Sequence, residues 1–115
     1  MNEQINNGAV RVLRDYTGRG PTKARTVIDH NSVTILLSDT LTSGERRLAD
    51  GGRAELVLNT RHEFQRLMRD DLVKVVEDAL DRKVIAFMST NHIDPDMAVE
   101  VFVLEPKAES DLDAG

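Results

Sequence analysis

Hydrophobic residues near the N-terminus recur at the spacing of a helix. Successive members lie three or four positions apart, apart from one adjacent pair, so they fall on one stripe of an amphipathic helix. The residues of this stripe are Ile5, Ala9, Val12, Leu13 and Tyr16. Gly18 ends the predicted helix, because glycine adopts the left-handed C-terminal conformation without steric penalty. The segment Gly18-Arg19-Gly20-Pro21 then indicates a turn that leads into a strand.

Two runs of alternating β-branched residues follow this turn. The first covers Lys23 to Ile28 and the second covers Ser32 to Ser38, with the turn formers Asp29-His30-Asn31 between them. This pattern predicts a β-hairpin. Because side chains alternate along a strand, Val33, Ile35 and Leu37 should share one face of it.

The middle of the chain predicts two helices separated by glycines. Thr42-Ser43-Gly44-Glu45 fits a capping box, which predicts a short helix over Glu45 to Ala49. Gly51-Gly52 interrupts it, and the following span Arg53 to Arg82 contains no Gly or Pro and has apolar residues at three-to-four spacing. A continuous helix of that span would be about 45 Å long, more than the diameter of a small domain. We therefore expect either a kink near Asn59-Thr60 or a projecting end that needs a partner.

A second hairpin is predicted at the C-terminal end. Its strands are Val84 to Ser89 and Met97 to Leu104, and the polar, proline-containing loop is Asn91 to Asp96. The order helix, hairpin, helix, hairpin predicts an α+β fold. In it, two αββ halves form a four-stranded, mainly antiparallel sheet packed with helices, including the long one. We expect one domain over residues 1–106 and a disordered acidic tail over residues 107–115.

Both faces of the predicted sheet are apolar. If Val33, Ile35, Leu37, Val99, Val101 and Val103 face the helices, the opposite face carries Leu36, Ile85, Phe87, Phe102 and Leu104. A contiguous apolar patch on a small protein marks an interface. We therefore predict a homodimer that buries this face, the projecting helix, or both. The alternative is that the N-terminal helix folds over the second face within one chain.

Composition narrows the possible chemistry. The 115 residues carry a net charge of −5 and no Cys, which excludes disulfides, thiol nucleophiles and thiolate zinc sites. The sequence shows neither an apolar run long enough to span a membrane nor the features of a signal peptide, so we expect a cytoplasmic protein without direct membrane insertion.

The segment from Gly18 to Arg25 is the strongest candidate for ligand binding. Glycines expose backbone N–H groups, and three basic residues lie close by, so Arg19, Gly20, Lys23 and Arg25 are candidate anion-binding residues. The segment does not match a Walker A loop and precedes a strand rather than a helix. A structural turn is therefore the favoured interpretation, with an anion site as the alternative.

Nothing else nominates a catalytic or metal centre. His62-Glu63 begins like a zinc-protease helix, but Arg66 stands where the second histidine is required. We predict no catalytic residues, no metal and no cofactor. Nucleic-acid binding is also not expected, because the pI is about 5.1 and aromatic residues are few.

Several segments together resemble the MpsC-like family, which is named as component C of a sodium-translocating, membrane-potential-generating system. They are Tyr16-Thr-Gly-Arg-Gly-Pro, the hairpin around Asp29, Leu41-Thr42-x-x-Glu45-x-x-Leu48, Arg61, and Val101-Phe102-Val103-Leu104-Glu105. The resemblance covers Tyr16 to Glu105. It implies a small cytosolic accessory protein linked to membrane machinery for cation or inorganic-carbon uptake, and it transfers no catalytic residues.

The leading hypothesis is a non-enzymatic, dimeric interaction module that serves as an accessory subunit of a membrane transport system. The alternative is an anion-, ligand- or nucleic-acid-binding regulator that uses the Gly-rich basic loop 18–25. An enzyme with its site at the dimer seam is a third possibility.

Overall fold

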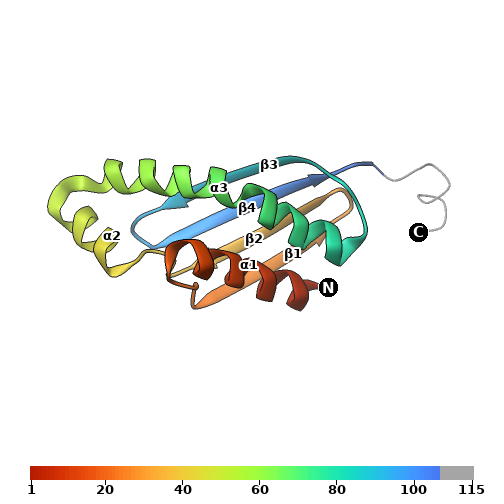
Figure 1. The fold of residues 1–115 in the computed structure, drawn as a ribbon, viewed down its shortest axis with the longest axis horizontal. Helices are drawn as coiled ribbons and strands as arrows, with labels where there is room; N and C mark the ends of the chain where they lie inside the picture. Colours follow the sequence, from red (N-terminus) through yellow and green to blue (C-terminus); the bar gives the residue numbers. More distant parts are fainter. Residues whose placement is uncertain (107–115) are drawn as a thin grey trace.

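The computed structural model describes residues 1–106, so the predicted acidic tail at 107–115 lies outside the described residues. Along the chain, helical segments precede each of two pairs of strands (Figure 1). The elements are α1 (Asn2–Thr17), β1 (Lys23–Asp29), β2 (Ser32–Ser38), α2 (Ser43–Leu48), the short helical turn η1 (Ala49–Arg53), α3 (Ala54–Leu80), β3 (Val84–His92) and β4 (Met97–Leu104).

The four strands form one antiparallel sheet in the order β1-β2-β4-β3. Each hairpin stays intact, and the two hairpins join through β2 and β4 at the centre of the sheet. This arrangement confirms the predicted α+β fold with two αββ halves. The second hairpin differs in detail, because β3 continues to His92 and shortens the predicted loop to residues 93–96.

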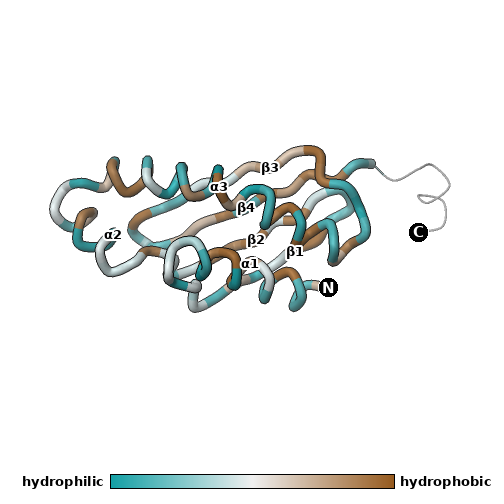
Figure 2. The backbone as a smooth tube through the Cα atoms, in the orientation of Figure 1, coloured by the Kyte–Doolittle hydropathy of each residue, from teal (hydrophilic) through white to brown (hydrophobic). Residues whose placement is uncertain are grey.

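Both long helices lie on the same face of the sheet (Figure 1). Ile5 and Leu13 of α1 and Leu72 of α3 are buried together with Ile35 and Phe102 of the central strands. The alternative that the N-terminal helix covers the second face of the sheet is therefore wrong. Figure 2 shows hydrophobic stretches along the strands and on parts of the helices, separated by hydrophilic turns.

Two local signals in the sequence are confirmed. Gly18 has a φ of 80°, and its N–H donates to the Arg14 carbonyl over 2.9 Å, which ends α1. The capping box is also present: the Glu45 N–H donates to Thr42 Oγ1 over 3.2 Å, and the Thr42 N–H donates to Glu45 Oε1 over 2.8 Å. These bonds start α2.

The chain reverses between α2 and α3. Gly52 has a φ of 86°, a conformation that favours glycine, and it turns the chain at the corner between the two helices. After it, α3 runs for 27 residues without the kink expected near Asn59-Thr60, a length of about 40 Å. Of the two expected outcomes, the structure shows the projecting end. The α2–α3 corner extends beyond the sheet (Figure 1), and the molecule measures 55 × 22 × 22 Å.

Candidate functional site

The sheet face opposite α1 and α3, here called the open face, carries apolar side chains at half of its positions, most of them on β4 and its neighbours. Alternation along the strands and the pairing between them define its members. They are Lys23, Arg25, Val27 and Asp29 on β1; Ser32, Thr34, Leu36 and Ser38 on β2; Met97, Val99, Val101 and Val103 on β4; and Ala86, Met88, Thr90 and His92 on β3. Val27 is 51% exposed, Leu36 39% and Met88 53%. Within the described chain, charged open-face side chains occur on β1 alone.

The predicted interface residues divide between the two faces. Leu36 and Ile85 are exposed, and Ile85 lies at an irregularity in the pairing of β3 with β4. Phe102 and Leu104 are completely buried beneath the helices, and Phe87 packs against Phe102 with 5.1 Å between ring centroids. These three aromatic and aliphatic side chains belong to the core and not to an interface.

This correction follows from an inverted assignment of faces on β4. Val99, Val101 and Val103 were expected to face the helices, but they lie on the open face. The cause is the other alternating set of β4, because Ala98, Phe102 and Leu104 are buried in the core beneath the helices. Glu100 belongs to the same set, so it is buried with them and is 1% exposed.

The Gly-rich segment does not bring its basic residues together. Lys23 and Arg25 lie on the open face of β1. Their neighbour Thr26 points the other way, is buried against α1, and donates its hydroxyl hydrogen to Asn6 Oδ1. Gly20 packs closely against Val10 and Arg14. Arg19 instead turns toward α2, and its Nε–H donates to the Asp39 carbonyl over 3.0 Å. The alternative of an anion site built from Arg19, Gly20, Lys23 and Arg25 is therefore not formed, and the segment serves as the turn between α1 and β1.

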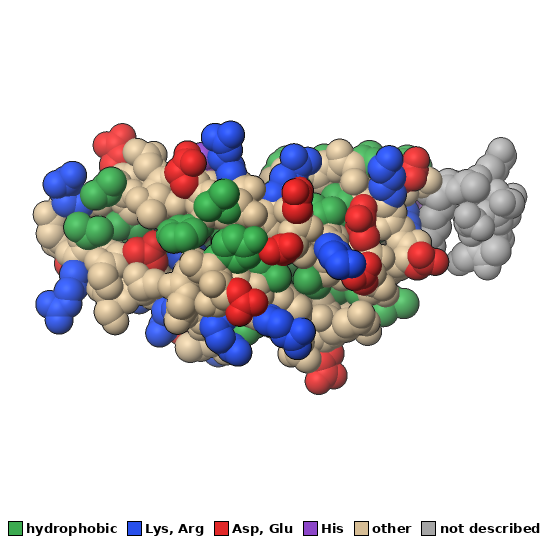
Figure 3. Space-filling model, viewed as in Figure 1, with side chains coloured by type: hydrophobic (Ala, Val, Ile, Leu, Met, Phe, Trp, Pro, Cys, Tyr) green, Lys and Arg blue, Asp and Glu red, His purple; other side chains and the backbone are tan. Residues whose placement is uncertain are grey.

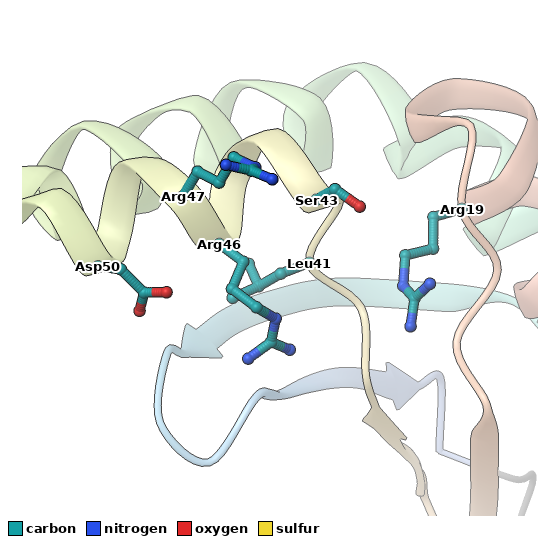
Figure 4. Close-up of a pocket in the computed structure, with 6 residues that line it drawn as sticks. All are labelled: Arg19, Leu41, Ser43, Arg46, Arg47 and Asp50. Atoms are coloured by element: carbon teal, nitrogen blue, oxygen red, sulfur yellow. The ribbon is translucent and has the colours of Figure 1, made fainter.

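Arg19 takes part in a different arrangement, a cavity beside α2 of about 540 Å³. Its lining residues are Arg19, Leu41, Ser43, Arg46, Arg47 and Asp50. Figure 4 shows Arg46 and Arg19 on either side of the segment that leads into α2, with both guanidiniums extending in the same direction, while Ser43 projects toward the Arg19 side and Arg47 lies along α2. Three arginines against one carboxylate make this lining basic. We call it the arginine pocket.

A buried carboxylate organises one wall of the arginine pocket. Asp96 is 8% exposed and accepts from the Thr40 N–H, Thr40 Oγ1 and the Leu41 N–H, each over 3.0 Å. Arg46 adds a fourth donor, Nη2, at 3.1 Å from Asp96 Oδ2. Asp96 thus holds together the end of β2, the loop before α2 and the turn before β4.

A second group of buried ionisable residues lies between α3 and the sheet. Arg61 is 2% exposed, and its Nη1 donates to the Thr40 carbonyl over 3.1 Å and to Glu45 Oε1 over 3.2 Å. Within residues 1–106, Arg61 Nε, Glu45 Oε2 and Glu100 Oε2 have no protein hydrogen-bond partner. Arg61 therefore forms its ion pair with Glu45, while Glu100 feels the charge of Arg61 without a direct bond to it.

Burial raises the pKa of Glu100 from its ordinary value of 4.5 to about 7. Two neighbours oppose this shift: the hydroxyl of Ser89, which is paired with Glu100 across β3 and β4, and the charge of Arg61. Desolvation outweighs both, so Glu100 changes its charge near neutral pH. This group was not predicted from the sequence, because its partner Arg61 lies 39 positions away along the chain.

The helical side of the molecule differs from the open face. Figure 3 views that side and shows basic and acidic side chains interspersed with apolar ones. Exposed leucines also occur there, including Leu56 on the projecting end and Leu67, which is 66% exposed. Charge is thus mixed across the helices.

Together, the fold and its surfaces define a class: a small α+β domain whose sheet is covered by helices on one face and open on the other. The chain belongs to the family described as "Na+-translocating membrane potential-generating system (MpsC)", which matches residues 1–106. This match confirms the resemblance seen in the sequence. No curated protein and no solved structure matches the chain. Of the helices in residues 1–106, none combines the length and apolar character that crossing a bilayer requires.

Proposed function

We propose that this chain is a non-enzymatic, cytoplasmic accessory subunit of a sodium-translocating, membrane-potential-generating system, and that it self-associates through the open face. The observation that carries the proposal is the apolar open face, whose strands β2, β3 and β4 present uncharged side chains only, as far as the described residues show. An apolar surface of this kind marks an interaction site on a small protein.

The size of the open face suits a second copy of the chain. The four strands lie about 4.8 Å apart, which gives the face a width of about 20 Å. Seven residues at about 3.3 Å per residue give it a length of about 23 Å. Side chains make the accessible area larger than this flat outline. Two such faces therefore approach the roughly 1,200 Å² of total buried surface at which stable interfaces begin.

The charges at the β1 edge of the open face can pair with the opposite charges of the same edge in a second copy. On β1, Lys23 and Arg25 lie at one end and Asp29 at the other. A two-fold axis between the sheets, perpendicular to the strands, would set β1 antiparallel to β1 of the second copy. The basic end of each β1 strand then meets Asp29 of the other copy, and the uncharged strands meet each other.

The family description supports the link to a sodium-translocating system. A non-enzymatic role is supported by the surroundings of the buried acidic groups. Asp96 accepts four hydrogen bonds, and Glu45 is bound to Thr42 and Arg61. Glu100 is 1% exposed, so a substrate in solution does not reach it.

The role is tested by measuring sodium-dependent membrane potential, with a potential-sensitive dye, in host cells from which the gene has been deleted. The wild-type chain should restore the potential. Val101→Arg, which places a charge at the centre of the open face, should fail to restore it at equal expression. Leu67→Arg places the same charge on the helical side and is the matched control, so it should behave as the wild type. A deletion strain with normal sodium-dependent potential would contradict the proposal.

A further inference from the structure

We infer that the arginine pocket beside α2 is a binding site for a phosphate group, held by Arg19, Ser43, Arg46 and Arg47. This inference does not depend on the proposed function, because the arginine pocket is formed by the loop after α1 and by α2, whereas the open face is formed by the strands.

Two of the arginines are already held in place. Arg19 uses its Nε–H on the Asp39 carbonyl, at 3.0 Å, and Arg46 uses one Nη2 hydrogen on Asp96, at 3.1 Å. Each guanidinium has five N–H donors, so most donors of both groups stay available. Both guanidiniums line the same cavity, and Figure 4 shows them extending in the same direction on either side of the segment that leads into α2. Because part of their motion is already restricted, a ligand that binds both of them loses less conformational entropy.

The charge of the arginine pocket is not balanced by its own carboxylates. Three arginines line it, against Asp50 in the lining and Asp96 behind Arg46. Asp96 divides its charge among four donors, three of which are not arginine. Arg47 has no ion pair with a carboxylate among the described residues. With Asp50 and Asp96 both counted, the three arginines leave an excess of one positive charge, which an anionic ligand would balance.

The available donors suit a phosphate group. Guanidinium groups bind phosphate through paired N–H···O bonds, and the Ser43 hydroxyl can donate a further bond. The volume of about 540 Å³ exceeds what a single phosphate occupies, so the pocket has room for the group that carries it. Two sources share this chemistry: a free phosphate or diphosphate in solution, and the head group of an anionic phospholipid.

The test uses the full-length protein and two probes. Isothermal titration calorimetry measures binding of inorganic pyrophosphate, and vesicle flotation compares phosphatidic acid in phosphatidylcholine with phosphatidylcholine alone. The variants are Arg46→Gln, Arg47→Ala and the double variant Arg19→Gln/Arg46→Gln. The matched control is Arg69→Ala, an exposed arginine of α3 outside the arginine pocket. Circular dichroism and the thermal midpoint check that each variant is folded.

We expect each single variant to weaken binding about tenfold, the loss of one charge-assisted contact, and the double variant to weaken it further. Pyrophosphate binding without vesicle binding would assign the site to a soluble phosphate. Binding to phosphatidic acid vesicles that the variants reduce would assign it to a lipid head group. The inference is overturned if neither probe binds, or if Arg69→Ala weakens binding as much as the pocket variants do. Arg47→Ala keeps the test decisive if loss of Arg46 unfolds the chain, because Arg47 has no hydrogen bond within the described fold.

Discussion

The two faces of the sheet both carry apolar side chains, yet their charged residues lie in different environments. The covered face holds Phe102 and Ile35 in the core and also buries Glu100. The open face presents Val99 and Val101 and has its charges at the β1 edge. The covered face can bury a carboxylate because α3 supplies Arg61 as a counter-charge. A charged residue in a strand therefore indicates the solvent-exposed face only when the helices covering the other face supply no opposite charge.

Removing that partner should have the largest effect on the covered face. Arg61→Met leaves Glu45 and Glu100 without a buried counter-charge, and the lost ion pair should lower the free energy of unfolding by about 5 kcal/mol. Urea unfolding at pH 7.5 measures the change. Adding Glu100→Gln to Arg61→Met should recover part of the loss, and full stability of the single variant would contradict the role given to Arg61.

Adjacent residues of β4 should separate the two faces most clearly. Phe102→Ala opens a cavity in the core and should cost about 4 kcal/mol, whereas Val101→Ala on the open face should cost about 1 kcal/mol or less in the free energy of unfolding. Denaturant midpoints of the two variants, measured side by side, give the comparison. Equal losses would mean that the open face is packed as tightly as the core.

Glu100 should make stability depend on pH. Its pKa is about 7 in the folded chain and 4.5 when unfolded, so between these values the folded state keeps a proton that the unfolded state releases. Stability should therefore fall as pH rises from 4.5 to 7, by about 3 kcal/mol at roughly 1.4 kcal/mol per pKa unit. Urea midpoints of the wild type and Glu100→Gln across this window measure the effect. The variant should lack this part of the slope, and parallel pH profiles would contradict the assignment.

The smallest effect is expected at the rim of the helical layer. The Tyr16 hydroxyl of α1 donates to Asp71 of α3 over 2.6 Å, which raises the pKa of Tyr16 above its ordinary value of 10. Tyr16→Phe should reduce the thermal midpoint less than any variant above, because the bond is exposed to water. The difference between wild type and variant should shrink as pH rises above 10, where the wild-type tyrosine loses its proton. A spectrophotometric titration of Tyr16 checks the direction of the shift.

Local chemistry made most of the fold predictable. Gly18, the capping box of Thr42 and Glu45, and the hairpin turns act within a few residues, so their signals are present in the sequence itself. The alternation of Val33, Ile35 and Leu37 also predicted the correct face of β2. The kink proposed at Asn59-Thr60 was wrong, because a projecting α2–α3 corner accommodates the length of α3.

Interactions between distant segments were not predictable in the same way. The face of β4 depends on the helices covering Phe102 and Leu104, and the arginine pocket depends on Arg46 and Arg19, 27 positions earlier, lining one cavity. The adjacent pair Arg46-Arg47 after the capping box was the one visible hint of this pocket. No short-range pattern places it beside the Gly-rich segment, because the pairing of β1 with β2 brings the two together.

The central claim is that the open face joins two copies of the chain, and sedimentation equilibrium at micromolar concentration tests it most directly. The wild type should have twice the 12.8 kDa mass of one chain. Val101→Arg should have the mass of one chain, while Leu67→Arg on the helical side stays at twice that mass. A wild-type mass of 12.8 kDa would contradict the account.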